Sequence, residues 1–385
     1  MQRQTALSVK KGAGERRWHF DTYFLGVVLT ISSFGILMFV SAALGIFARD
    51  KSIFYGILFN QIVLGFLGGL LLLWIMMHIP YPFWRRHAFV IFLITVILTL
   101  LVFVPQLGLK HGGARRWISV GPISFQPAEF LKFGFIIYLS TWLAWVRKKG
   151  EEVKYKIIPL VVMLLVVGGA LLKQPDTKSL VLVVVASAAM LFVSGVSWKR
   201  IGIILGTGAI ALAALAFFRP YVMERIQTFM NPDLDPQGAS YQLRQSLIAV
   251  GSGGIAGRGL GQSVQKFSYL PEPQGDSIFA VIAEEFGFVG STIVVILYIF
   301  LAIRGYKIAA NAPDSFGRYL VTGLVTLIVA QSFLNIASLV GLFPLTGVPL
   351  VFISHGGTSL AIALASVGII LNVSMYRKNL SRRVY

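Results

Sequence analysis

One aspartate stands at the junction between a polar segment and an apolar helix. The segment 219–276 is rich in polar residues, glycine and proline, and Asp276 is its last residue. A carboxylate at such a junction can accept a proton from a substrate hydroxyl, which is general-base chemistry. Aspartate is also a favoured N-cap, and an apolar helix begins directly after it. The two interpretations are compatible, because a capping aspartate at an exterior cleft stays accessible to a substrate.

Two further acids, Glu284 and Glu285, follow within that apolar helix. Asp276, Ala280 and Glu284 share one helical face, which is small and acidic and therefore unsuited to lipid. We expect this face to line the bundle interior or an aqueous cleft. The rise of a straight helix places Glu284 about 12 Å deeper than Asp276.

Charged residues also gather near the start of an earlier apolar segment. Glu129 and Lys132 are three residues apart, so they share a helical face and can pair. They form either a salt bridge at the helix start, where Pro127 occupies the first turn, or a charged pair at an outward-facing cavity. Asp176 follows Pro175, a combination typical of a turn.

Small and polar residues interrupt the last apolar segment. Gly356 and Gly357 follow Ser354 and His355, a pattern typical of close helix packing or of a broken helix. Close packing is the favoured interpretation. The chain has no cysteine, no HExxH motif and no histidine pair at metal-binding spacing, so a dedicated transition-metal site is not expected.

The composition predicts that membrane helices position these residues. The chain has 385 residues, of which 56% are hydrophobic and 13% charged, and its mean hydropathy is +0.78. A helix needs about 20 apolar residues to cross a bilayer. We expect an all-α polytopic membrane protein with one ten-helix domain over 22–375. The expected spans are 22–47, 54–78, 87–105, 127–146, 157–172, 178–196, 201–218, 277–303, 317–340 and 347–374.

The net charge of +19 reflects membrane topology rather than nucleic-acid binding. Lys and Arg are enriched in the short inner loops if the N-terminus lies inside, as the positive-inside rule requires. The basic tails 1–21 and 376–385 are then cytoplasmic. The large loop 219–276, between the seventh and eighth spans, is extracytoplasmic.

The order and spacing of these motifs resemble the SEDS family of polytopic membrane proteins (shape, elongation, division and sporulation), which includes FtsW and RodA. The resemblance covers nearly the whole chain after residue 20, and the stretch from Lys266 to Pro273 is more similar to FtsW than to RodA. Three motifs carry it: Gly113-Ala…Arg116-Trp…Gln126-Pro-Ala-Glu129…Lys132; Tyr241-Gln…Gln245-Ser246 through Gly259-Leu-Gly-Gln-Ser to Tyr269-Leu-Pro-Glu272…Asp276…Glu284-Glu285; and Pro349…Ser354-His-Gly-Gly-Thr-Ser.

The resemblance implies a peptidoglycan glycosyltransferase of the bacterial cytoplasmic membrane. Such proteins polymerise lipid II, a disaccharide-pentapeptide carried on undecaprenyl diphosphate. They work with a class B penicillin-binding protein, a transpeptidase, among other divisome or elongasome membrane proteins and in contact with membrane lipids. The family's essential loop aspartate corresponds to Asp276, which would be the general base for the acceptor GlcNAc 4-hydroxyl.

The same resemblance guides the expected substrate contacts. Arg116, Lys132 and Lys266 are candidates for the diphosphate, because basic groups neutralise phosphate charge. A divalent cation, Mg²⁺ or Mn²⁺, would be bound mainly through the substrate diphosphate, and no organic cofactor is expected. The full set of substrate-binding candidates is Arg116, Glu129, Lys132, Asp176, Gln245, Ser246, Lys266, Glu272, Glu284 and Ser354.

The chain departs from the family pattern beside several of these residues. Gln274-Gly-Asp-Ser stands where the family usually has His-Thr-Asp-Phe, and Pro175-Asp-Thr-Lys-Ser where it usually has Pro-Asp-Leu-Gly-Thr. Two alternatives stay open, a lipid II flippase and a non-catalytic division scaffold. A flippase needs polar groups through the whole bilayer. Here the candidate polar residues concentrate on the outer side, which favours chemistry there: Asp276, Glu272, Glu129, Asp176 and Arg116.

Overall fold

The computed structural model describes residues 19–111, 114–120, 123–150, 154–204, 206–208, 220–231 and 240–376. These residues form a bundle of long helices, as expected for an all-α polytopic membrane protein. The two expected basic tails, 1–21 and 376–385, lie almost wholly outside the described residues.

Eight helical segments of the described residues are long and apolar enough to cross a membrane, and the apolar helix α7 (Thr177–Val193) is slightly shorter. They match nine of the ten expected spans, and the span expected at 201–218 lies mostly outside the described residues. The eight are α1 (Thr22–Arg49), the continuous run of α2 (Lys51–Phe59), the π-helix η1 (Asn60–Leu67) and α3 (Gly68–His78), then α4 (Pro82–Leu101), α5 (Pro127–Lys149), α6 (Lys154–Lys173), α12 (Ile278–Ala310), α13 (Ser315–Leu339) and α14 (Gly357–Met375).

The last span begins ten residues later than expected. Residues 343–356 are not helical, and α14 starts only at Gly357. Pro344 and Pro349 lack the N–H that a helix needs, and Gly347 has a φ of 63°. The double glycine serves packing as well, because a Cβ on Gly357 would lie 2.9 Å from the Asn60 carbonyl oxygen.

Amide side chains from neighbouring helices satisfy this irregular segment. Gln61 donates to the Ser354 carbonyl (3.1 Å) and accepts from the Gly356 N–H (3.0 Å). Gln331 of α13 donates to the carbonyl of Pro349 at 3.2 Å. Non-helical backbone inside a membrane domain requires such partners, since water is not there to replace them.

The large loop between the seventh and eighth expected spans contains three helices. These are α9 (Pro220–Met230), α10 (Tyr241–Ser252) and α11 (Gln265–Ser268). The helix after the loop, α12, is broken at Gly287, whose φ of 64° and ψ of −161° are not helical. Its first part packs against α10, and a Cβ on Gly253 would collide with the Ala283 carbonyl oxygen.

A small antiparallel sheet, which was not expected, precedes α5. It has the order β1 (Gly108–His111), β2 (Ala114–Val120) and β3 (Ile123–Phe125). Ile118 of β2 pairs with Gly108 on one side and with Phe125 on the other. The sheet carries Arg116 to the turn between α6 and α7.

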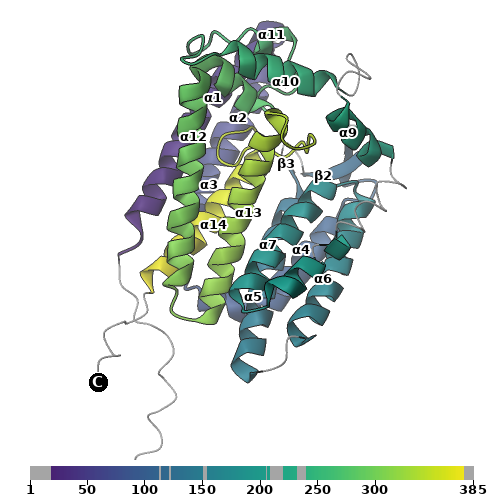
Figure 1. The fold of residues 1–385 in the computed structure, drawn as a ribbon, viewed down its shortest axis with the longest axis vertical. Coiled ribbons are helices and arrows are strands. Elements are labelled where there is room, and N and C mark those ends of the chain that lie inside the picture. Colours follow the sequence, from purple (N-terminus) through teal and green to yellow (C-terminus); the bar gives the residue numbers. More distant parts are fainter. Residues whose placement is uncertain are drawn as a thin grey trace, which may run out of the picture.

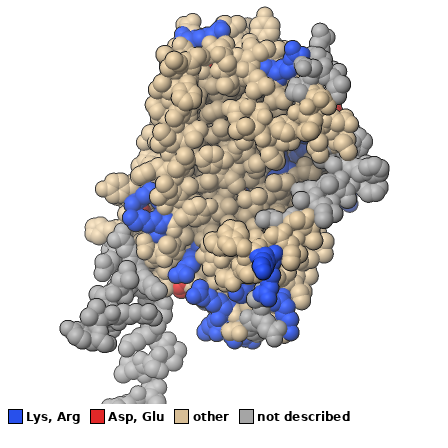
Figure 2. Space-filling model, viewed as in Figure 1, with Lys and Arg blue, Asp and Glu red and all other residues tan. Residues whose placement is uncertain are grey.

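The loop helices and the end of α14 lie at opposite ends of the bundle. In Figure 1, α9, α10 and α11 lie at the upper end, and α14 ends near the lower end. Lys and Arg gather at the lower end in Figure 2, below a broad band almost without them. The last turn of α5 contributes Arg147, Lys148 and Lys149 to that end.

Candidate active site

Asp276 lies between the large loop and α12, and amide side chains from two other helices bond it. Its Oδ1 accepts from Gln242 Nε2 of α10 at 3.2 Å, and its carbonyl accepts from Asn335 Nδ2 of α13 at 2.7 Å. The residue is half-buried. Burial raises the pKa of the Asp276 carboxyl, and the charges of Lys178 and Arg225 and the bond from Gln242 offset part of that rise.

The capping interpretation of Asp276 does not match the helix boundary. The N-cap position of α12 is occupied by Ser277, whose side chain accepts no first-turn hydrogen bond. Ser277 Oγ instead accepts from Gln242 Nε2 at 3.1 Å. Gln242 therefore fixes both residues at the start of α12.

Three charged residues from distant parts of the chain meet around Gly347. A Cβ on this glycine would lie 3.3 Å from Asp276 Oδ2 and 3.7 Å from Arg225 Nη2. Lys178 Nζ of α7 donates to the Gly347 carbonyl at 2.5 Å, and Arg225 Nη1 of α9 donates to the Leu345 carbonyl at 2.6 Å. We call Asp276, Lys178, Arg225 and Gly347 the Gly347 site.

Glycine is required at position 347 for two reasons. Its φ of 63° is unfavourable for residues with a Cβ, and a methyl group would press on the Asp276 carboxylate. We expect Gly347→Ala to reduce turnover roughly tenfold to hundredfold, as small displacements of a reacting group do. The assay is strand synthesis from a labelled lipid-linked sugar. Gly26→Ala, in α1 and without neighbours within 4 Å, is the matched control; equal rates for both variants would contradict this role of Gly347.

Arg116 and Asp176 organise the turn that presents Lys178. Arg116 donates from Nε to the Gln174 carbonyl (3.1 Å) and from Nη2 to the Pro175 carbonyl (2.6 Å). Asp176 caps α7, accepting from the N–H of Ser179 at 3.3 Å and from its hydroxyl at 2.8 Å. Both side chains are thus engaged with the turn, and Arg116 is not directed at Asp276 as a free phosphate-binding group.

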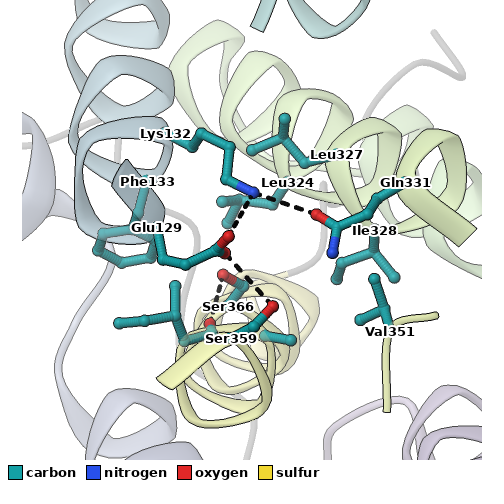
Figure 3. Close-up of a pocket in the computed structure, with 12 residues that line it drawn as sticks. Glu129, Lys132, Phe133, Leu324, Leu327, Ile328, Gln331, Val351, Ser359 and Ser366 are labelled. Atoms are coloured by element: carbon teal, nitrogen blue, oxygen red, sulfur yellow. Dashed lines mark hydrogen bonds and ion pairs between the residues drawn. The ribbon is translucent and has the colours of Figure 1, made fainter. Parts of the chain in front are cut away.

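Glu129 and Lys132 form the expected ion pair, and both residues line a small cavity. Lys132 Nζ lies 2.9 Å from Glu129 Oε1 and donates to Gln331 Oε1 at 3.1 Å. Figure 3 shows these groups facing one another from α5 and α13, with Ser359 of α14 donating to Glu129 at 3.4 Å. Ser366 and seven apolar residues complete the lining: Phe133, Leu324, Leu327, Ile328, Val351, Ile362 and Ala363.

Two amide side chains of α13 link the lining of this cavity to Asp276 through hydrogen bonds. Gln331, which bonds Lys132, stands one helical turn before Asn335, which bonds the Asp276 carbonyl. Both amides also hold the irregular segment, through the carbonyls of Pro349 and Val348. A polar row therefore joins the cavity to the Gly347 site.

Glu284 is not in a deeper cleft below Asp276, contrary to the expectation. Its partners belong to the large loop: the Ser263 hydroxyl at 2.5 Å, the Val264 N–H at 3.0 Å and the Arg258 guanidinium at 3.4 Å. The expectation considered α12 alone, whereas the part of α12 before Gly287 packs against α10, and Glu284 faces residues of the loop. Glu284 fastens the loop to α12.

Lys266 is likewise unavailable to a diphosphate in this structure. Its Nζ lies 2.6 Å from Glu285 Oε1 and 3.0 Å from Ser41 Oγ of α1, and both charged side chains have no exposed surface. The pair joins the loop, α12 and α1. This ion pair is at odds with the expectation that Lys266 binds the diphosphate, which rested on the positive charge of the residue alone.

The remaining candidates differ in their access to the site. Glu272 is exposed and has a φ of 45°, and its Oε2 accepts from Gln274 Nε2 at 3.2 Å. Ser246 is buried and donates to the Gln242 carbonyl, so it supports the helix that bonds Asp276. Gln245 is half-buried on α10, and the Ser354 hydroxyl is buried and accepts from the Leu350 N–H at 2.7 Å.

Sequence reasoning missed Gln242, Lys178 and Arg225. They lie 34, 98 and 51 positions before Asp276, and only the folded chain brings them together. Lys178 carried one signal, because it departs from the usual family pattern directly after the Pro-Asp turn.

Comparisons with known proteins agree with this architecture. The family model for FtsW, RodA and SpoVE, described as "Cell cycle protein", matches residues 21–379. Stage V sporulation protein E of Bacillus subtilis is 36% identical over 93% of this chain and 98% of its own length. A probable peptidoglycan glycosyltransferase FtsW of Trichlorobacter lovleyi is 36% identical over 92% of this chain and 93% of its own.

Solved structures share the fold. A chain from "Structural coordination of polymerization and crosslinking by a peptidoglycan synthase complex" aligns with a TM-score of 0.77 and 27% identity over 93% of this chain and 98% of that one. The Thermus thermophilus rod shape determining protein RodA aligns with a TM-score of 0.69 and 26% identity, over 94% of this chain and 98% of that one.

The bundle of long apolar helices defines a multi-pass membrane protein. The chain belongs to the SEDS family of peptidoglycan glycosyltransferases, together with FtsW, RodA and SpoVE.

Proposed function

We propose that this protein polymerises lipid II into glycan strands at the outer face of the cytoplasmic membrane, with Asp276 as the general base. The observation that carries the proposal is the Gly347 site, in which a half-buried carboxylate of raised pKa lies beside two cations. A raised pKa suits proton transfer near neutral pH, because a better base accepts the hydroxyl proton more readily.

The reaction balances with the groups present. The acceptor 4-hydroxyl oxygen attacks C1 of the donor sugar, the bond from C1 to the diphosphate oxygen breaks, and Asp276 takes the hydroxyl proton. The undecaprenyl diphosphate leaves with its electron pair. Gln242 orients the carboxylate through the bond to Oδ1. The row of polar side chains from the Glu129–Lys132 cavity to Asn335 supports binding of the rest of the lipid II headgroup in this region.

The proposed orientation puts both termini in the cytoplasm and the loop helices outside. The end crowded with Lys and Arg then faces the cytoplasm, in keeping with the positive-inside rule. The opposite end, with Asp276 and the loop, meets lipid-linked substrate in the outer leaflet.

A divalent cation would have to arrive with the substrate. Among the described residues, no group of three or more His, Asp or Glu side chains could hold a metal ion. The residues present therefore do not fit a dedicated metal site, and no step of the proposed reaction is assigned to an ion. Our proposal includes Mg²⁺ or Mn²⁺ bound mainly through the substrate diphosphate.

The proposed protein partner is a class B penicillin-binding protein. The structural relative with a TM-score of 0.77 comes from a peptidoglycan synthase complex whose description joins polymerization and crosslinking. A similar pairing here would bring a transpeptidase to the new strand, within the divisome or the elongasome.

A reconstitution assay tests the proposed function against transport. Purified protein in liposomes, with and without its cognate transpeptidase, would receive fluorescent lipid II and Mg²⁺. We expect labelled glycan strands. Lipid II that crosses the bilayer without forming strands would contradict the enzyme and favour the flippase, and neither strands nor crossing in the presence of the transpeptidase would favour the scaffold.

A further inference from the structure

We propose that Lys178 is a second functional residue of the Gly347 site, where its ammonium binds the diphosphate of the lipid-linked sugar. The proposal rests on the proposed function and adds a residue that the sequence motifs did not indicate. Three observations support the proposal: the position of Lys178, the few hydrogen-bond acceptors around its ammonium among the described residues, and the charges nearby.

The position of Lys178 follows from the turn before α7. Asp176 caps the helix and Arg116 holds the two carbonyls before it, so the first turn of α7 is fixed with Lys178 directed at Gly347. Asp276 is close to the same glycine, because a Cβ on Gly347 would lie 3.3 Å from Asp276 Oδ2. The Lys178 ammonium and the Asp276 carboxylate, the proposed base, therefore both lie next to Gly347.

The ammonium is poorly satisfied by the residues around it. It has three N–H donors, and in the described part of the chain its hydrogen-bond acceptor is the neutral carbonyl of Gly347. The Asp176 carboxylate, two residues away, is already engaged with Ser179 and Gln126. A half-buried ammonium on a neutral carbonyl gains a stronger partner when an anion arrives, because the attraction between opposite charges is added to the hydrogen bond.

Two neighbouring polar atoms also point to an absent ligand. Thr346 Oγ1 and Asn335 Oδ1 are buried and have no hydrogen-bond partner among the described residues. Thr346 precedes Gly347, and Asn335 bonds the backbone on both sides of the site, at Asp276 and Val348. Buried polar groups are nearly always paired, so a ligand with both donors and acceptors fits here. A sugar diphosphate has both.

The charges around the site favour an anion when Asp276 takes up a proton. Asp276 faces the charges of Lys178 from α7 and Arg225 from α9. Lys178 also faces Asp176, Arg116 from β2 and Glu129 from α5. As the glycosidic bond forms, the proton neutralises Asp276 while negative charge grows on the leaving diphosphate. The Lys178 ammonium is then attracted less by the protonated Asp276 and more by the diphosphate. It stabilises the negative charge on the leaving group as the bond breaks.

The test compares Lys178→Met with Lys178→Arg and with a matched control, Lys173→Met, in the full-length protein with its transpeptidase. Lys173 lies on the same turn but contacts the ring of Phe103 at 4.8 Å. We expect Lys178→Met to slow polymerisation about 10²-fold, the usual loss when a stabilising donor is removed. It should also weaken inhibition by added undecaprenyl diphosphate at least tenfold. Lys178→Arg should keep most of both properties, and Lys173→Met should match the wild type.

The pH profile separates a functional role from a structural one. Without the cation, the Asp276 carboxyl becomes harder to ionise, so the acidic limb of the profile should move to higher pH in Lys178→Met. An unchanged limb and unchanged inhibition would overturn the proposal, even if the rate fell. An active Asp276→Asn variant would instead overturn the proposed base, whatever Lys178→Met does. Thermal unfolding in detergent verifies that each variant is folded.

Discussion

Replacing Asp276 with asparagine is expected to reduce lipid II polymerisation by about 10²-fold to 10⁴-fold, the range that a general base contributes. Asparagine keeps the shape and can still accept from Gln242, so the start of α12 should stay in place. The loss therefore reports the missing proton acceptor rather than unfolding. The measurement is the initial rate of strand synthesis at pH 7.

The control for this variant is Asp50→Asn. Asp50 caps α2 through the N–H groups of Ser52 and Ile53, and asparagine is an equally good cap. We expect wild-type rates for it. A comparable loss in both variants would mean that the assay detects general damage and not catalysis.

The pH dependence of the wild-type enzyme carries the same information. The Asp276 carboxyl must be ionised to act as a base, so activity is present above its pKa in the folded protein and is lost as the pH falls through it. Burial raises that pKa above the ordinary value of 3.8. We expect the acidic limb of the rate profile to lie at a higher pH than an exposed aspartate would give.

The second large effect concerns stability and the buried pair of Lys266 and Glu285. The variant Glu285→Gln leaves the Lys266 ammonium buried without a countercharge, which typically costs about 3–5 kcal/mol. We expect a markedly lower midpoint of thermal unfolding in detergent. Loss of the pair should also loosen the outer loop from α1, and protease cleavage in that loop should become faster.

A double variant and an exposed pair provide the controls. Lys266→Met combined with Glu285→Gln removes both charges and should recover part of the lost stability. Arg85, 4.0 Å from Asp314, belongs to a half-exposed pair, and Arg85→Gln should cost less than about 1 kcal/mol. A Glu285→Gln variant as stable as Arg85→Gln would contradict the structural role of the buried pair.

Local patterns in the sequence were sufficient to predict most of the membrane helices. Apolar runs identify helices such as α5 and α13 because a lipid-facing backbone has few alternatives to the α-helix. The start of α14 was missed by ten residues, since hydropathy is insensitive to the backbone of the segment around Pro349. The three-stranded sheet before α5 was also missed, because its strands are short.

The site was predicted less completely than the fold. Asp276 is marked by its position after a polar loop, and Glu129 and Lys132 by their spacing on one helical face. Gly287 could not be recognised as a break in α12, because glycine is common in membrane helices. Lys178 and Asp276 are brought together at Gly347, which lies 169 positions after Lys178. No local sequence pattern encodes such a contact.

The most direct measurement is the glycan product formed by wild-type protein and Asp276→Asn, each reconstituted with the transpeptidase and fluorescent lipid II. Products would be separated by length on a gel, at equal amounts of folded protein. We predict long strands from the wild type and from Asp50→Asn, and unreacted lipid II from Asp276→Asn. Strands of wild-type length and yield from Asp276→Asn would contradict the assignment of Asp276 as the catalytic base.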